Sequence, residues 1–356
     1  MAITIDTLNA VTKPFWPKDK MTNTVMRSTP IFEYLKRGMK PGSGTKMDFD
    51  VEYARLGGGP RTATGQMTLT TPEIATQGTL GWSHYYVPVK LEQLYIEMNE
   101  SDPQKVANYL NMYTASALET MREKHLAPDL FTPQTGAHMY SIADAVSDSA
   151  TYAGLAKADI PSWRAIAAEA TYDETTSVGV SPSLENIRRM IRRIKAISGK
   201  TPDIVAVDTD LWDVLASQID NNDQVSAQRQ NSDVIKWGFD AIFVNGVPIV
   251  DDINLPCPGE FDATGATRTD CKGHTAYFLN FDNLFLYYLP SRKFSWDKMG
   301  WVSTSDYTDY INKIYFTGNI GCTLRRSQGV LYGIDTAQAP SAWSKVNIDI
   351  TPFAVV

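Results

Sequence analysis

The sequence predicts an α+β protein in which a long β-hairpin leads directly into a long helix. Three observations predict this fold class. Residues 46–91 alternate apolar and polar side chains on both sides of a segment rich in Gly and Thr. Residues 102–126 repeat apolar side chains every three or four positions, as an amphipathic helix does. Residues 181–334 then combine helical segments with short apolar strands, which indicates an α/β lobe followed by late strands.

The first 44 residues predict an extended arm. Only the residues around Ile31–Lys36 have helical spacing, and four prolines interrupt the segment, at Pro14, Pro17, Pro30 and Pro41. The arm has too few apolar residues to form a core of its own, so it must lie on another surface. Two alternatives stay open: the arm lies on a neighbouring subunit, or it is a strap across its own domain.

The hairpin is expected to consist of a strand over residues 46–56, a tip over 57–78 and a returning strand over 79–91. Pro88 cannot donate a backbone hydrogen bond, which places the returning strand at a sheet edge or a strand end. A tip of this length is usually functional or ordered by a partner. Either neighbouring copies order it or the hairpin folds back on its own domain. The tip residues expected to contact a neighbour are Arg61, Met67, Leu69, Glu73 and Ile74.

The long helix, here called the spine helix, is predicted to begin near Ser101 and to end before Pro128. Ser101 and Gln104 have the spacing of a capping box, and Pro103 suits a first turn. From Asp102 to Leu126 such a helix spans roughly 37 Å. The following segment, residues 131–179, is of mixed character, with a short helix predicted over 162–170.

The α/β lobe opens at Ser181-Pro182. We predict a helix over 184–197 that ends at Gly199, a strand over 203–207, and a helix over 210–219. The Asn245-Gly246 pair predicts a tight hairpin between strands 241–244 and 247–250. Later apolar segments predict strands within 276–289 and 311–334, with Gly318 and Gly321 as breaks, and then an extended tail.

Composition excludes several classes. The net charge is 33 − 40 = −7, whereas general nucleic-acid binders are basic. Three cysteines, Cys257, Cys271 and Cys322, show no paired spacing, which favours free thiols in a reducing cytoplasm. The first residues do not have the pattern of a signal peptide, and no apolar run approaches 18 residues. We therefore expect a protein that is soluble and intracellular when made, with no membrane partner.

No catalytic, cofactor or metal site is predicted. Gly199-Lys200-Thr201 resembles the end of a phosphate-binding loop, but Ile194 stands where the motif needs glycine. Cys257, Cys271 and His274 lack a Cys-x-x-Cys pair and an obvious fourth ligand. The other histidines, His84, His125 and His138, stand apart from any nucleophile motif.

One helix carries an unusual concentration of positive charge. Its basic residues lie opposite the apolar stripe of the predicted helix 184–197, and they are Arg188, Arg189, Arg192, Arg193 and Lys195. Two interpretations stay open. The face contacts an acidic neighbour or DNA phosphate, or it is simply a solvated helix face.

The order of these parts resembles the major capsid proteins of tailed bacteriophages, which have the Hong Kong 97-type fold. The resemblance covers almost the whole chain and rests on architecture, because no signature motif carries it. It implies an N-terminal arm over 1–44, an extended loop over 45–95, and a peripheral domain with the spine helix over 96–180. It further implies an axial domain over 181–310, and return strands of the peripheral domain with the tail over 311–356.

The resemblance also implies a function. Such proteins assemble as hexamers and pentamers into an icosahedral shell around double-stranded DNA, in the host cytoplasm, with scaffold, portal and decoration proteins as possible partners. Contact with the packaged DNA is expected to be weak and non-specific. The family's lysine–asparagine cross-link is not expected here, since residues 57–78 contain no lysine. Because the chain begins with the arm, we expect any scaffold to be a separate protein.

Two other functions compete with this one. Encapsulin compartments share the fold but package enzymes, so nucleic-acid content separates them from phage capsids. The alternative of another class is a soluble cytoplasmic α/β enzyme with an unrecognised site. Such an enzyme is expected to form a compact monomer or small oligomer with a pocket lined by convergent polar groups.

Overall fold

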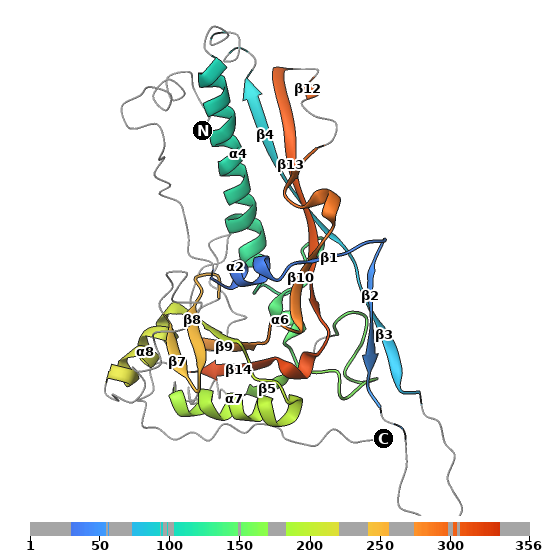
Figure 1. Ribbon diagram of the computed structural model, residues 1–356, viewed down its shortest axis with the longest axis vertical. Helices are drawn as coiled ribbons and strands as arrows, with labels where there is room; N and C mark the ends of the chain where they lie inside the picture. Colours follow the sequence, from blue (N-terminus) through green and yellow to red (C-terminus); the bar gives the residue numbers. More distant parts are fainter. Residues whose placement is uncertain are drawn as a thin grey trace, which may run out of the picture.

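The computed structural model describes residues 30–54, 56, 73–92, 94, 98, 103–148, 151–169, 183–220, 241–255, 274–297, 302–304 and 307–334. These residues form an elongated molecule (Figure 1). The spine helix and two long strands rise from one end of a broad lower lobe, and a separate hairpin extends from its side. None of the helices in this described part has both the length and the apolar character needed to cross a membrane.

The first sheet is built around one strand, β13 (Tyr307–Cys322). Four strands pair with it, three from residues 284–304, just before it in the chain, and one from residues 83–92, and β10 also pairs in parallel with β1. The members of this sheet besides β13 are β1 (Lys40–Pro41), β4 (Ser83–Glu92), β10 (Leu284–Tyr288), β11 (Ser295–Trp296) and β12 (Val302–Thr304).

Strand β4 lies at the edge of this sheet and covers the spine helix with one of its faces. It pairs antiparallel with β13, from Ser83 opposite Gly318 to Glu92 opposite Asp309. Alternate residues are buried and exposed along the strand, and β13 is the one partner of β4 in the described sheet. The edge position predicted from Pro88 is therefore confirmed, since its missing N–H costs no ladder hydrogen bond on the open side.

The spine helix is continuous but not uniform. It begins as α4 (Pro103–Thr120), widens into a π-helical segment at Met121–Leu126, and ends in α5 (Ala127–Asp129). Ala117, Met121 and Leu126 are buried against the core, in agreement with the predicted apolar face. The predicted cap at Ser101 lies outside the described residues.

The second sheet forms the lower lobe, in the order β5-β14-β9-β6-β8-β7. It mixes parallel and antiparallel pairs. One face is covered by α7 (Leu184–Ser198) and α8 (Thr209–Asp220), and the other joins the main core beneath the spine helix. The strands are β5 (Ile166–Glu169), β6 (Ile204–Val207), β7 (Ile242–Val244), β8 (Val247–Asp251), β9 (His274–Leu279) and β14 (Gly329–Ile334).

Several predictions for this lobe are confirmed. Helix α7 is capped by the Ser183 hydroxyl, which accepts the N–H of Glu185 at 3.1 Å, and it ends at Gly199 in the left-handed region with φ 72°. Asn245 and Gly246 both have positive φ, 53° and 80°, as the predicted tight hairpin turn requires. Local sequence chemistry thus determined these elements.

The predicted helix over 162–170 is wrong. Residues 166–169 instead form β5, which pairs in parallel with β14 from Ile166 opposite Gly329 to Glu169 opposite Tyr332. Alanine favours helix, but the open edge of β14 offers these residues a complete ladder of hydrogen bonds. A short capped helix that the sequence analysis did not predict, α6 (Ile142–Ala145), lies between the spine helix and β5 in the chain.

Gly318 and Gly321 do not break the late strands, because β13 runs through both. They are required by close packing instead. A Cβ at Gly318 would lie 2.6 Å from the carbonyl oxygen of Tyr287, and one at Gly321 would lie 3.0 Å from the ring of Phe285. Two 3-10 turns, Pro290–Arg292 and Arg325–Ser327, connect the strands around β13.

The residues of the arm that are described lie on their own subunit. Helix α2 (Pro30–Arg37) buries Ile31, Phe32 and Leu35 in the main core. The N–H of Gly42 then donates to the carbonyl of Tyr288 at 2.8 Å. For residues 30–44 the structure therefore favours the strap across its own domain, while the first 29 residues lie outside the described part. The sheets draw strands from both sides of the predicted domain boundaries, which stay predictions.

Candidate assembly surfaces

The hairpin projects from the side of the molecule (Figure 1). Strands β2 (Met47–Glu52) and β3 (Ala75–Leu80) pair antiparallel with Met47 opposite Leu80 and Glu52 opposite Ala75. The returning strand thus begins earlier than predicted and stops at Leu80, since the chain is held at Gly81. The Gly81 carbonyl accepts hydrogen bonds from the Tyr287 hydroxyl at 2.6 Å and the Asn319 amide at 3.0 Å.

The base of the hairpin is fixed to the body by its apolar face. Phe49 packs against Trp163 with ring centroids 6.0 Å apart and the rings tilted by 38°, and the N–H of Thr79 donates to the Ala153 carbonyl at 2.9 Å. A Cβ at Gly78 would lie 2.9 Å from the Phe49 ring, so glycine lets the ring lie across β3. The hairpin therefore leaves the body at a defined angle.

The far end of the described hairpin exposes apolar side chains. Ile74 is 38% exposed and Leu56 is 67% exposed. Of the predicted tip residues, Glu73 and Ile74 are exposed beside β3, whereas Arg61, Met67 and Leu69 lie outside the described residues. Their contact with a neighbouring subunit stays a prediction.

The other face of β2 carries a row of carboxylates that the sequence analysis did not single out as a site. Asp48, Asp50 and Glu52 are all exposed, and their cross-strand partners are the uncharged Thr79, Gln77 and Ala75. Within the described residues none of the three carboxylates forms an ion pair. The signal that could have revealed this row was the strict alternation of acidic and apolar residues. We call these three residues the acidic row.

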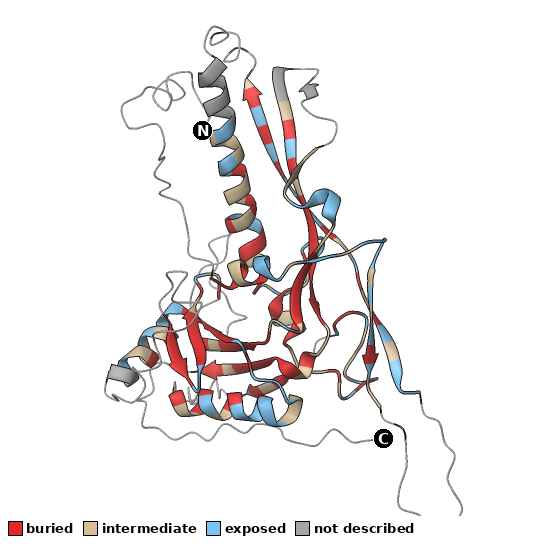
Figure 2. Cartoon of the chain, in the orientation of Figure 1, coloured by how far each residue is buried: buried red, intermediate tan, exposed pale blue. Residues whose placement is uncertain are grey.

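Helix α7 presents the opposite charge on its outer face, and much of that face is exposed (Figure 2). Its buried side, which includes Ile187, Met190, Ile191 and Ile194, packs on the lower sheet. The structure brings the five predicted basic residues together on the outer side of this helix. Arg189 is half-buried, and the other four are exposed, namely Arg188, Arg192, Arg193 and Lys195.

This basic surface is only slightly compensated. Arg189 pairs with Glu185 at 3.3 Å across one turn, and in the described chain no acidic group pairs with Arg188, Arg192, Arg193 or Lys195. Like charges four residues apart, such as Arg188 and Arg192, destabilise a helix slightly. The position of Lys195 near the C-terminal end is favourable to the helix dipole. The basic face, as we call these five residues, thus carries excess charge.

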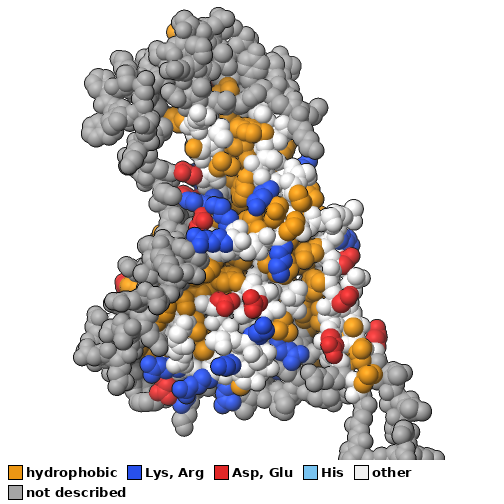
Figure 3. Space-filling model, viewed as in Figure 1, with side chains coloured by type: hydrophobic (Ala, Val, Ile, Leu, Met, Phe, Trp, Pro, Cys, Tyr) orange, Lys and Arg blue, Asp and Glu red, His pale blue; other side chains and the backbone are white. Residues whose placement is uncertain are grey.

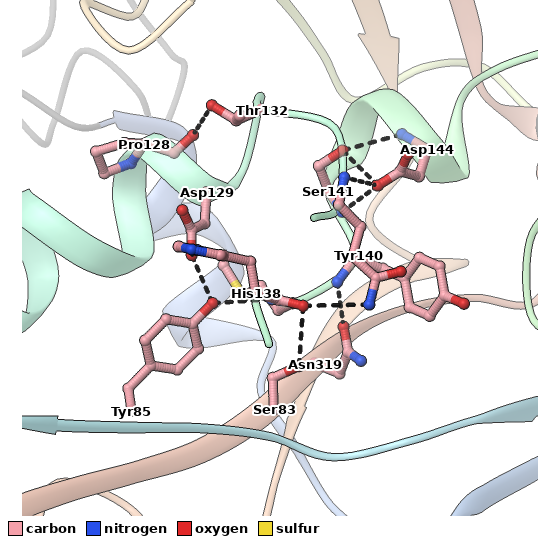
Figure 4. A network of polar contacts seen from close by, with 12 residues as sticks. Ser83, Tyr85, Pro128, Asp129, Thr132, His138, Tyr140, Ser141, Asp144 and Asn319 are labelled. Atoms are coloured by element: carbon pink, nitrogen blue, oxygen red, sulfur yellow. Dashed lines mark hydrogen bonds and ion pairs between the residues drawn. The ribbon is translucent and has the colours of Figure 1, made fainter. Parts of the chain in front are cut away.

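A third region, a polar network, ties the end of the spine helix to the first sheet (Figure 4). The Tyr85 hydroxyl of β4 donates to Asp129 Oδ2 at 2.5 Å and accepts the N–H of Met139 at 2.9 Å. His138 Nδ1 lies 2.8 Å from the same carboxylate oxygen. Burial, followed by the hydrogen bond to Asp129, raises the pKa of Tyr85 well above its usual value. The tyrosine therefore remains a neutral hydrogen-bond donor.

The remaining polar clusters have structural explanations. One ligand-type atom from each of Asp208, Asp210 and His274 lies within 4.8 Å of the others. Asp208 and His274 are joined directly, Oδ2 to Nδ1, at 2.5 Å, which fastens the start of β9 to the beginning of α8. Cys257 and Cys271, which the sequence analysis considered as metal ligands together with His274, lie outside the described residues. Burial raises the pKa of the Cys322 thiol to about 12, so it is an unreactive core residue.

Comparisons of the whole chain place this architecture among known ones. No family model matches the sequence, and no curated protein does. Among solved structures, the chain is similar to one in the capsid asymmetric unit of cyanophage A-1(L), with a TM-score of 0.67 and 16% identity over 89% of this chain and 95% of that one.

Two further structures are similar over nearly their full lengths. The holo-SrpI encapsulin complex of Synechococcus elongatus gives a TM-score of 0.52 at 11% identity, over 95% of this chain and 98% of that one. The capsid of the Myoviridae phage XM1 gives 0.50 at 13% identity, over 94% and 99%. The chain therefore has the fold of these capsid and encapsulin chains, which confirms the Hong Kong 97-type α+β fold predicted from the sequence.

Proposed function

We propose that this chain is the major capsid protein of a tailed bacteriophage, a structural subunit that assembles into an icosahedral shell around double-stranded DNA. The observation that carries the proposal is its fold, shared with the cyanophage capsid chain over 89% of its length at a TM-score of 0.67. Copies would form hexamers and pentamers in the host cytoplasm and remain in the virion.

The surface chemistry of the subunit supports self-assembly. A hairpin that projects from the body with exposed Leu56 and Ile74 at its far end leaves apolar surface in water, and such surface is typical of interaction sites. Head-to-tail contacts between identical subunits close into rings when the rotation allows it. Many modest contacts of this kind add up over a shell, so no single interface has to be strong.

The wider set of partners follows from the same proposal. With a net charge of −7, the subunit is suited to weak, non-specific contact with packaged DNA. Scaffold, portal and decoration proteins would be separate chains, and the tip residues Arg61, Met67 and Leu69 would contact the adjacent subunit.

A second candidate function is an encapsulin-type compartment that packages protein. The similarity to the SrpI encapsulin complex, over 95% of this chain at a TM-score of 0.52, supports this second function. Shells purified from infected or expressing cells separate the two functions. Protected double-stranded DNA supports the capsid, whereas nucleic-acid-free shells that hold a cargo enzyme support the compartment.

The hairpin provides the sharper test. The test uses a variant in which a short Gly-Ser linker replaces residues 57–72. This change leaves the paired strands β2 and β3 intact. We expect a subunit that unfolds at the same temperature as the wild type but no longer forms complete shells in sedimentation velocity. Normal particles from this variant would refute the role of the hairpin in assembly.

A further inference from the structure

Two surfaces of this subunit carry uncompensated charge of opposite sign. The acidic row of β2 presents Asp48, Asp50 and Glu52 without ion pairs among the described residues. The basic face of α7 presents four cations that likewise form no ion pair among the described residues, beside Arg189, which pairs with Glu185. Figure 3 shows both on one side of the molecule, with the acidic side chains along the hairpin and the basic ones along the lower edge.

The two surfaces also have matching repeats. Alternate residues on a strand are about 6.6 Å apart, so the acidic row places its carboxylates at this spacing. Residues four apart on a helix are about 6 Å apart along the axis, which is the separation of Arg188 from Arg192. Arginine side chains are long enough to absorb the small difference, and guanidinium groups bind carboxylates in a bidentate manner.

We propose that the acidic row of one copy docks on the basic face of α7 in a neighbouring copy. The inference rests on the proposed function, since it requires an assembly in which each hairpin reaches an adjacent subunit. The occupant is a second copy of this chain because every copy brings one acidic row and one basic face, in equal numbers. DNA phosphate is the competing occupant of the basic face, and the test below distinguishes it.

The contact accounts for two unfavourable features of the isolated subunit. A two-stranded ribbon is marginally stable in water, and three like charges along one face weaken it further. On α7, cations at positions 188, 192 and 193 repel one another. Docking would neutralise the acidic row and the basic face at once. It would also fix the register of the hairpin on its neighbour, as complementary charges do at interfaces.

The test uses charge reversal of the full-length protein in three variants. The row variant is D48K/D50K/E52K, with a net charge of −7 + 6 = −1, and the face variant is R188E/R192E/R193E, with −7 − 6 = −13. The swap variant combines both sets and returns to −7. Shell yield is measured by sedimentation and electron microscopy, and DNA content by absorbance of the shells.

We expect the row and face variants each to lower shell yield about tenfold or more, and the swap variant to recover most of it. A control combines the face variant with D159K, D213K and D282K, which also restores −7 but leaves the acidic row unchanged. These three carboxylates are exposed and lie outside the row, so the control should not recover shells.

The outcomes separate the inference from the proposed function. If the wild type forms no shells, the proposed function fails. If the wild type forms shells but the swap variant stays as defective as the face variant, or the control recovers equally, the docking contact is wrong. Normal shell yield with reduced DNA content in the face variant would assign the basic face to DNA and overturn the inference.

Discussion

Arg325 illustrates how a single residue holds distant segments together. Its side chain is buried, and its guanidinium donates to four backbone carbonyls, those of Asp144, Ala145, Ser147 and Trp163. Burial lowers the pKa of the guanidinium from its usual value. The residue thus fastens the end of α6 and the irregular segment that follows it to the start of β14.

Removing this side chain should be severely destabilising. We expect Arg325→Ala to lower the free energy of unfolding of the unassembled subunit by about 4 kcal/mol, because buried carbonyls lose their donors and a cavity remains. The matched control is Arg326→Ala at the next, partly exposed position, where we expect a change of about 1 kcal/mol or less. Equal effects of the two substitutions in urea unfolding would contradict this role.

Asp252 links the arm to the lower lobe, and its ionisation makes stability depend on pH. Its carboxylate accepts the N–H of Ile31 at 3.3 Å and both the N–H and side-chain amide of Asn254. Burial raises the pKa to about 6, and these hydrogen bonds lower it only in part. The folded state therefore keeps a proton on Asp252 at pH values where the unfolded chain, with a pKa of 3.8, has lost it.

The sign of the effect follows from linkage. The folded-state pKa is raised, so the contribution is fully present below pH 3.8 and is lost as pH rises towards about 6. The loss amounts to about 3 kcal/mol for a shift of this size. In Asp252→Asn this part of the pH dependence disappears, so from pH 4 to pH 7 the wild type should lose about 3 kcal/mol of stability relative to the variant. A stability difference between wild type and variant that stays constant from pH 4 to pH 7 would refute this role of Asp252.

At the scale of elements, close packing of β10 on β13 depends on glycine. We expect Gly318→Ala to cost about 1–3 kcal/mol, since its Cβ would lie 2.6 Å from the Tyr287 carbonyl and force the two strands apart. Gly81→Ala is the control, because a Cβ there meets no atom within 4 Å. Thermal unfolding of both variants measures the difference, and comparable losses would show that packing at Gly318 is unimportant.

Local chemistry decided which elements the sequence could predict. Helix α7 and the β7–β8 hairpin have strong signals of their own, a cap with an apolar stripe in one case and Asn245-Gly246 in the other. Strand β5 was mistaken for a helix because its partner β14 lies more than 150 residues away in the sequence. The end of β3 at Leu80 was missed for the same reason, since Tyr287 and Asn319 fix Gly81. Tertiary contacts, not local preferences, set these boundaries.

The candidate surfaces were predicted unevenly for a similar reason. The basic face of α7 is visible in the sequence because helical spacing gathers its arginines on one side. The acidic row was visible as an alternation, but its meaning depends on β3 offering only the neutral partners Thr79, Gln77 and Ala75. A sequence alone does not reveal which charges lack partners after folding.

For the whole molecule, we propose that copies of this chain build a closed shell. The subunit buries a large core yet extends a hairpin away from it, and the charged outer face of α7 borders its lower sheet. The proposed contact between the acidic row and the basic face would be heterologous, and heterologous contacts close into rings when the rotation allows it.

The most direct measurement is negative-stain electron microscopy of the purified full-length protein, with light scattering for its mass. We predict closed, uniform shells whose mass corresponds to many copies of the 39.5 kDa chain. A single species at 39.5 kDa, unchanged by protein concentration or salt, would contradict the account.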